Sequence, residues 1–143
     1  MGNRKCPKFS ELNPKVQSVI CFVVTMAISL FVFKFVFLIG YVPSASMEPT
    51  LKTGSLCLGL RTVNVDNCDV GDILIFKHDG GIMVKRVAAV GGDKFVSDTG
   101  KTFIVPEDHF LMLGDNKEES YDSRYWDNPY VNKEDVVAKL ILP

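Results

Sequence analysis

Ile82-Met83-Val84-Lys85-Arg86-Val87 is a short apolar run with two basic residues, and it lies between the turn-forming groups Asp79-Gly80-Gly81 and Gly91-Gly92-Asp93. Side chains alternate between two faces along a β-strand, so Lys85 would share a face with the apolar residues two positions away, and Arg86 would lie on the other face. Short runs bounded by Gly and Asp are typical of strands joined by tight turns. The stretch therefore predicts a strand in an antiparallel sheet.

The same pattern continues through the rest of the chain after residue 47, where no stretch has helical periodicity. Many short strands at short spacing favour an all-β domain over an α/β domain. We predict a mostly β fold, a small antiparallel and partly closed barrel-like domain over residues 43–143. The further predicted strands are 55–60, 73–76, 94–96, 102–105, 110–113 and 136–142.

A long apolar segment precedes this domain. Residues 19–39 form a run of 21 residues interrupted only by Lys34, close to the ~20 that a helix needs to cross a bilayer. We predict a transmembrane anchor over residues 16–42. The basic segment 1–15 predicts a cytoplasmic N-terminus and an extracytoplasmic domain, in a protein of the cell membrane with a single pass.

A cleavable signal peptide is the alternative interpretation of this segment. Ser44-Ala45-Ser46 has the small residues of a cleavage site. The apolar run is, however, longer than the ~7–15 residues of a typical signal peptide core, which favours the anchor.

The composition is that of a folded domain, with 47% hydrophobic and 23% charged residues. Residues 43–143 contain 11 Lys and Arg and 16 Asp and Glu, a net charge of −5, so nucleic acid is not an expected partner. The spacing of Cys6, Cys21, Cys57 and Cys68 fits no zinc or redox motif, and no metal or cofactor is expected. Cys57 and Cys68 could form a disulfide in an exported domain or could be separate buried residues.

The candidate nucleophile is Ser46, in the turn-rich segment Pro43-Ser44-Ala45-Ser46-Met47-Glu48-Pro49-Thr50-Leu51. A serine is a weak nucleophile until a base removes its proton. His78 and His109 lie in polar surroundings typical of surface histidines. Lys85 could serve as the base if burial in an apolar site lowered its pKa, but an edge-strand lysine that faces water fits the pattern equally well.

A second polar cluster, residues 114–126, directly follows a predicted strand. Its central residues Lys117, Glu118 and Glu119 are typical of a solvated loop. The other polar residues suit a hydrogen-bonded scaffold beside an active site. These are Gly114, Ser120, Asp122, Ser123 and Arg124.

These segments together resemble type I signal peptidases, the membrane-anchored Ser/Lys endopeptidases that remove signal peptides from exported proteins. The short chain is similar to the compact Gram-positive form, without the large inserted second β-domain of many Gram-negative members. The resemblance covers the length of the chain in the family's order. It comprises the N-terminal anchor, Ser44–Leu51, Gly71-Asp72-Ile73, Val84-Lys85-Arg86-Val87, Gly114-Asp115-Asn116 and Ser120–Trp126.

The resemblance implies a catalytic dyad, with Ser46 as nucleophile and Lys85 as general base. It implies an oxyanion hole made by the Ser46 backbone N–H and the Ser44 hydroxyl. It also implies that substrate lies extended against strand edges, with small side chains one and three residues before the cut.

The resemblance further implies how the dyad is supported. Ser120 would orient the Lys85 amine, and Asp122 would pair with Arg86 and so fix the strand that carries the base. Gly114 and Arg124 belong to the same implied scaffold. The chain departs from the family pattern in its acidic stretch Lys117-Glu118-Glu119 and in Asp127, where the family usually has glycine.

The implied partners are preprotein signal peptides, membrane lipid and, as a further candidate, the secretion translocon. Two other functions fit the sequence. One is a non-catalytic or dedicated relative that helps assemble a surface protein or pilus. The other is a plain secreted β-domain from which the first 45 residues are removed.

Overall fold

The computed structural model describes residues 13–142, which divide into two units at residues 35 and 36. Residues 1–12, which hold most of the predicted basic segment and Cys6, lie outside the described residues. The described part of the first unit belongs almost entirely to one apolar helix, α1 (Pro14–Val36). By length and composition this helix can cross a membrane.

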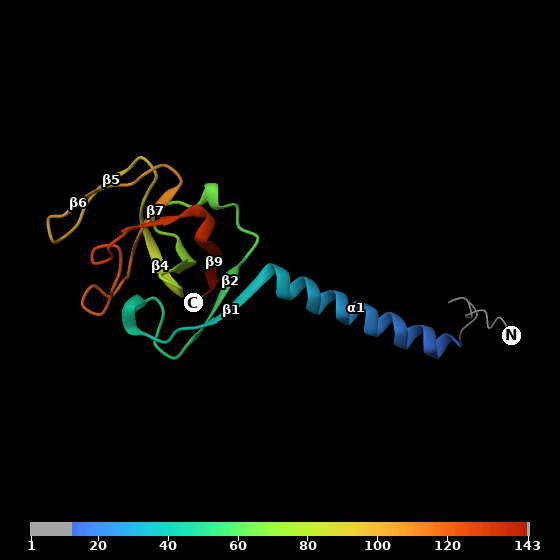
Figure 1. Cartoon of the computed structure of the whole chain (residues 1–143). Coiled ribbons are helices and arrows are strands. Elements are labelled where there is room, and N and C mark those ends of the chain that lie inside the picture. The colour runs from blue at the N-terminus through green and yellow to red at the C-terminus, as the bar shows by residue number, and fades with distance from the viewer. Residues whose placement is uncertain (1–12, 143) are drawn as a thin grey trace. The chain divides into compact units, whose positions relative to one another are not determined.

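The second unit is built from antiparallel strands (Figure 1). Seven strands form one sheet in the order β1-β2-β9-β3-β4-β7-β8, and β5 and β6 form a separate two-stranded sheet. The predicted mostly β, partly closed fold is confirmed, since the large sheet is antiparallel and does not close. The strands are β1 (Phe37–Tyr41), β2 (Leu56–Leu60), β3 (Ile73–His78), β4 (Gly81–Val90), β5 (Lys94–Val96), β6 (Thr102–Ile104), β7 (His109–Leu113), β8 (Tyr130–Asn132) and β9 (Val136–Leu142).

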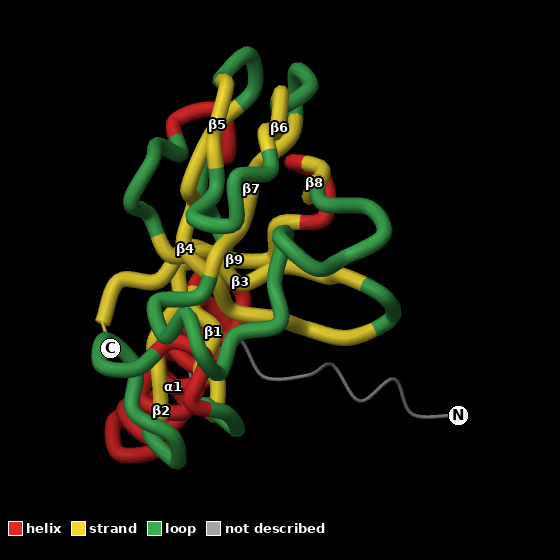
Figure 2. Tube along the Cα trace, turned by 90° about the vertical axis from the view of Figure 1, so that its left-hand side faces the viewer, coloured by secondary structure: helices red, strands yellow, loops and turns green. Residues whose placement is uncertain are grey.

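The hairpin of β5 and β6 and the pair of β1 and β2 lie at opposite ends of this domain, as Figures 1 and 2 both show. Short 3-10 turns connect several strands, at Ala45–Met47, Val65–Asn67 and Lys133–Asp135. The seven predicted strands are all present, with bounds that differ by a few residues at most. β8 was not among the predicted strands, because its three residues are too few to show an alternating pattern.

The prediction that the apolar helix continues to Ile39 is wrong. The helix ends at Val36, and the next five residues form β1, which pairs along its whole length with β2. Arg61 helps to hold the start of this strand, because its backbone N–H and its Nε donate to the carbonyls of Val36 and Phe37. Hydropathy alone could not locate this boundary, since an apolar strand and an apolar helix have the same composition.

The core lies on both faces of β3, whose first four residues are all buried. Leu74 and Phe76 pack with one cluster that includes Trp126, and Ile73 and Ile75 pack with another that includes residues near Ser46. A third cluster lies where Phe103 of β6 packs on Leu111 of β7. Core clusters on both faces of the sheet therefore fix β3, the strand that pairs with β4.

Cys57 and Cys68 are free thiols buried in different clusters, so the disulfide is not formed and the alternative of two separate buried residues holds. Burial raises the pKa of both thiols, which keeps them protonated and unreactive at neutral pH.

Phe76→Ala should strongly destabilise the β-domain. The side chain is fully buried and lies 6.2 Å from Trp126 between ring centroids, so its loss leaves a cavity that costs about 3–5 kcal/mol. The measurement is denaturant unfolding of the detergent-solubilised chain, followed by fluorescence of its single tryptophan. Ile104→Ala, at a side chain that is 68% exposed, should change the free energy of unfolding by less than about 0.5 kcal/mol. Equal effects in the two variants would contradict this assignment of the core.

Candidate active site

Ser46 lies in a short 3-10 turn, Ala45–Met47, that packs directly onto the core. Met47 and Leu51 are each 1% exposed and anchor the turn in the cluster on one face of β3. The Ser46 side chain is itself buried, and its Oγ accepts a hydrogen bond of 3.3 Å from the Ser44 hydroxyl. The burial of Met47 and Leu51 thus fixes the position of the turn and, with it, of the Ser46 hydroxyl.

Lys85 is buried in β4, with 5% of its surface exposed. This excludes the alternative that it is an edge lysine facing water. Burial lowers the pKa of its amine; Asp122 and Asp115 act in the opposite direction, and Arg124 adds to the lowering. The net effect is a lowered pKa, which increases the fraction of neutral amine, the form that can accept a proton.

The Lys85 amine donates a 3.0 Å hydrogen bond to Ser120 Oγ. Ser120 Oγ in turn donates to Asp122 Oδ2 at 2.7 Å. Ser120 has a single hydroxyl proton, and it donates this proton in the hydrogen bond to Asp122. The Ser120 oxygen can therefore only accept a hydrogen bond from Lys85. A neutral Lys85 held by one of its N–H groups keeps its lone pair free for another proton donor.

The Asp122 carboxylate is fully buried and has several donors. It accepts from the Gly114 backbone N–H at 2.9 Å, and Arg124 contacts both of its oxygens, through Nε at 2.9 Å and Nη2 at 2.8 Å. Burial alone would raise the pKa of Asp122, but the hydrogen bonds from Arg124, Gly114 and Ser120 hold it below its usual range. The carboxylate therefore stays ionised and keeps accepting from Ser120.

The predicted pair of Asp122 with Arg86 is wrong. Arg86 instead makes a bidentate pair with Asp115, through Nε at 2.7 Å and Nη2 at 2.6 Å, and Thr50 donates to the same carboxylate. Burial would raise the pKa of Asp115, but these hydrogen bonds lower it. Arg86 lies on the face of β4 opposite Lys85 and cannot reach the partner of Ser120.

At Gly114 the loop of residues 114–126 contacts the 3-10 turn Ala45–Met47, which contains Ser46. A Cβ built at this glycine would lie 2.5 Å from the Ser46 carbonyl oxygen and 2.5 Å from the Ser120 Cβ. The next contact in the loop is the Asn116 N–H, which donates to the same Ser46 carbonyl at 3.1 Å. The loop thus contacts the backbone of Ser46 through its first residues and the amine of Lys85 through Ser120 at its middle.

Ser46 and Lys85 line one groove of about 610 Å³. Its walls come from residues 38–43 on one side and residues 82–85 of β4 on the other. β1 is an edge strand, and the first half of β4 pairs only with β3, because its pairing with β7 begins at Arg86. Two strand edges that are unpaired in the described sheet therefore border the groove.

Among the described residues, Ser46 and Lys85 are not hydrogen-bonded to each other. Catalytic hydrogen bonds are often absent or long before substrate is bound. The histidines do not line the groove: His78 stacks on Trp126 at 3.9 Å between ring centroids, and His109 contacts the Glu107 carbonyl. Within residues 13–142 no group of three or more His, Cys, Asp or Glu could hold a metal ion.

Comparison with known proteins places these features in a family. The chain matches the family described as signal peptidase, peptidase S26, over residues 15–104 and 95–143. The chain belongs to this signal peptidase family. The resemblance drawn from the sequence motifs is thereby confirmed.

Three relatives illustrate the range of this family. A probable signal peptidase I-2 of Synechocystis is 27% identical over 71% of this chain and 60% of its own length. A signal peptidase I of Leptolyngbya laminosa is 24% identical over 91% of this chain and 79% of its own length. An inactive signal peptidase IA of Staphylococcus aureus is 22% identical over 89% of this chain and 90% of its own length.

Gly114→Ala should destabilise the domain and displace the loop, because a methyl group has no room between Ser46 and Ser120. Overpacking of this kind costs about 1–3 kcal/mol, measured by denaturant unfolding. Gly81→Ala is the matched control, since its Cβ would meet only the His78 carbonyl at an ordinary 3.7 Å. A Gly114→Ala variant as stable as the control would contradict the close approach of the loop to Ser46.

Proposed function

We propose that this protein is a membrane-anchored serine endopeptidase that removes signal peptides from exported preproteins, with Ser46 as nucleophile and Lys85 as general base. One observation carries the proposal. A buried lysine with a lowered pKa, held by Ser120, lines the same groove as a buried serine. Family membership supports the same activity.

The proposed reaction is acyl transfer. Neutral Lys85 accepts the Ser46 proton, and Ser46 Oγ attacks the carbonyl carbon of the scissile bond. The tetrahedral oxyanion is stabilised by the Ser46 backbone N–H and by the Ser44 hydroxyl, which must rotate away from Ser46 Oγ to reach it. The Lys85 ammonium then donates its proton to the leaving amine, and Lys85 activates the water that hydrolyses the acyl-enzyme.

The groove suits an extended peptide. Strand edges of β1 and β4 border it, so a substrate backbone could pair with either edge by β-augmentation. Small side chains one and three residues before the cut, the preference implied by the resemblance, would let the peptide approach Ser46 closely. Preprotein signal peptides are the proposed partners.

We further propose that α1 anchors the protein in the cell membrane, with a cytoplasmic N-terminus and an extracytoplasmic β-domain. The helix is long and apolar enough to span a bilayer. Lys34 lies in its last turn, from which a long side chain can extend toward the interface. Membrane lipid and the secretion translocon are the corresponding candidate partners.

The match to a relative named as inactive favours a second candidate, a non-catalytic factor that uses the same groove to hold a surface protein. Both candidate functions use the same groove, but only the first requires Ser46 and Lys85 to react. An assay of peptide cleavage therefore distinguishes the two functions.

The decisive experiment incubates the detergent-solubilised full chain with a preprotein carrying an Ala-x-Ala site and reads the products by mass. Ser46→Ala and Lys85→Met should each lower turnover by at least about 10²-fold, since each removes a group that takes part in the proton transfer. Lys85→Arg should lower turnover as strongly, because a guanidinium does not lose its proton and cannot act as the base. Lys77→Met, at an exposed lysine of β3, is the control and should cleave normally. No cleavage by any form would favour the non-catalytic function.

The rate should depend on pH through Lys85. The base is active only when neutral, so kcat/KM should rise with pH, with a slope of one on a logarithmic plot, and level off above the pKa of Lys85. Burial lowers this pKa, so the rise should end below the ordinary lysine value of 10.5. Asp115 and Asp122, whose pKa values are lowered, stay ionised throughout this range. A rise centred near 10.5 would argue against a buried lysine base.

A further inference from the structure

One residue of the acidic stretch that departs from the family pattern, Glu119, lines the groove. Glu119 and Tyr121 both line it, whereas the neighbouring Glu118 does not. They flank Ser120, whose hydroxyl oxygen accepts a hydrogen bond from Lys85, so both residues are next to a contact of the proposed base. Glu119 therefore lies close to the place where a scissile bond would be.

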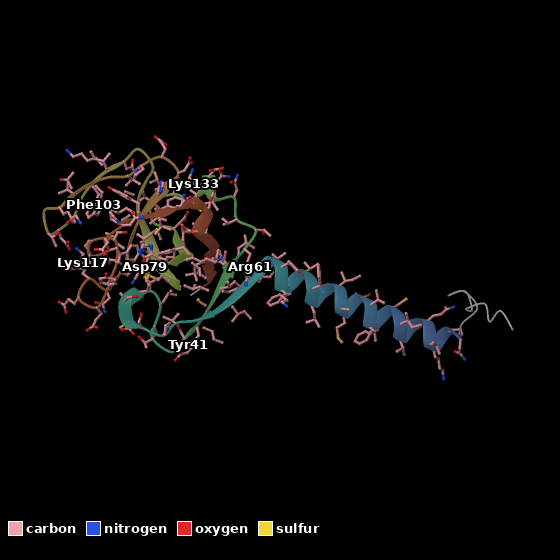
Figure 3. All side chains as sticks on the ribbon, in the orientation of Figure 1. Tyr41, Arg61, Asp79, Phe103, Lys117 and Lys133 are labelled. Atoms are coloured by element: carbon pink, nitrogen blue, oxygen red, sulfur yellow. The ribbon has the colours of Figure 1, made fainter. Side chains whose placement is uncertain are left out.

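The other charged residues of the groove do not neutralise Glu119. Arg61 lies at the start of β1 and Tyr41 at its end (Figure 3). The five residues of this strand span about 17 Å, so Arg61 and Tyr41 lie at opposite ends of this wall of the groove. In the proposed mechanism Lys85 is neutral when substrate binds. In the described part of the chain Glu119 takes part in no ion pair.

Tyr121 adds an aromatic surface beside this carboxylate. Its ring is 61% exposed and stacks on Tyr125, with centroids 6.4 Å apart and planes at 15°. The Arg124 guanidinium lies 5.4 Å from the centre of the Tyr125 ring on its way to Asp122. The position of Tyr121 is thus tied to the buried ion pair of the active-site loop, although the ring itself is open to a ligand.

A carboxylate and an aromatic face on the same side of a groove are the two groups that recognise a cationic side chain, by charge and by cation–π attraction. We propose that Glu119 and Tyr121 select substrates that carry Lys or Arg within two residues of the cut. The inference rests on the proposed function. Small residues are required only one and three positions before the cut, so the position between them and the first two after the cut are available for a basic residue.

The test uses matched peptides with Ala one and three residues before the cut and with Lys, Gln or Glu at each of the three open positions. The full chain should cleave a Lys peptide about two- to fivefold faster in kcat/KM than its Gln counterpart at one of these positions, and the Glu peptide more slowly. Glu119→Gln should remove the difference and Glu119→Lys should reverse it. Salt of about 1 M, where the Debye length is ~3 Å, should weaken it.

Two controls separate Glu119 from the general charge of the domain. Glu118→Gln removes the same charge from an exposed neighbour outside the groove and should keep the preference for Lys. Tyr121→Leu should reduce the preference and leave its sign unchanged. A preference that survives Glu119→Gln, or that is lost equally in Glu118→Gln, would overturn the assignment.

Binding of the same peptides to a Ser46→Ala variant, by fluorescence anisotropy, distinguishes this inference from the proposed function. Tighter binding of Lys peptides without cleavage by the native chain would support the cation site and reject the protease. Ser46-dependent cleavage with equal rates for Lys, Gln and Glu at all three positions would support the protease and reject the cation site.

Discussion

The Asp122 carboxylate is fully buried, and the geometry of the whole site follows from the donors that it needs. A buried charge without partners costs several kcal/mol, so the loop must bring Arg124, the Gly114 N–H and Ser120 onto this one group. As a result, the loop of residues 114–126 contacts the Ser46 carbonyl, and its Ser120 hydroxyl oxygen accepts a hydrogen bond from Lys85. The proposed nucleophile and base come from distant parts of the chain, and the Asp122–Arg124 ion pair links their surroundings.

Most of the fold could be predicted from the sequence because its strands are short, apolar and bounded by Gly and Asp. The pattern was clear in β3 and β4, where the turn at Asp79 and Gly80 separates two alternating runs. It failed at β1, because its apolar residues continue the composition of α1 without a break. Only the pairing of β1 with β2, a contact between distant residues, ends the helix at Val36.

The site was predictable as a set of residues but not as a set of contacts. Ser46 and Lys85 stand out by their surroundings in the sequence. Asp115 and Asp122, however, are two carboxylates of one loop, and either could have paired with Arg86. The pairing register of β4 with β7 selects Asp115 as the partner of Arg86, because Arg86 lies opposite Leu113, two residues before Asp115. The place of Glu119 beside the groove was missed for a related reason: its run of charges is typical of a solvated surface, and only the folded structure shows that this residue lines the groove.

The unpaired edges of β1 and of the first half of β4 also affect how the protein behaves when no peptide is bound. An open strand edge accepts any extended backbone, including that of a second copy of the same chain. The walls of the groove add exposed apolar side chains to these edges, among them Ile39 and Ile82. The groove is therefore where self-association of the chain is expected to begin, and a peptide paired along these edges would cover the same surface.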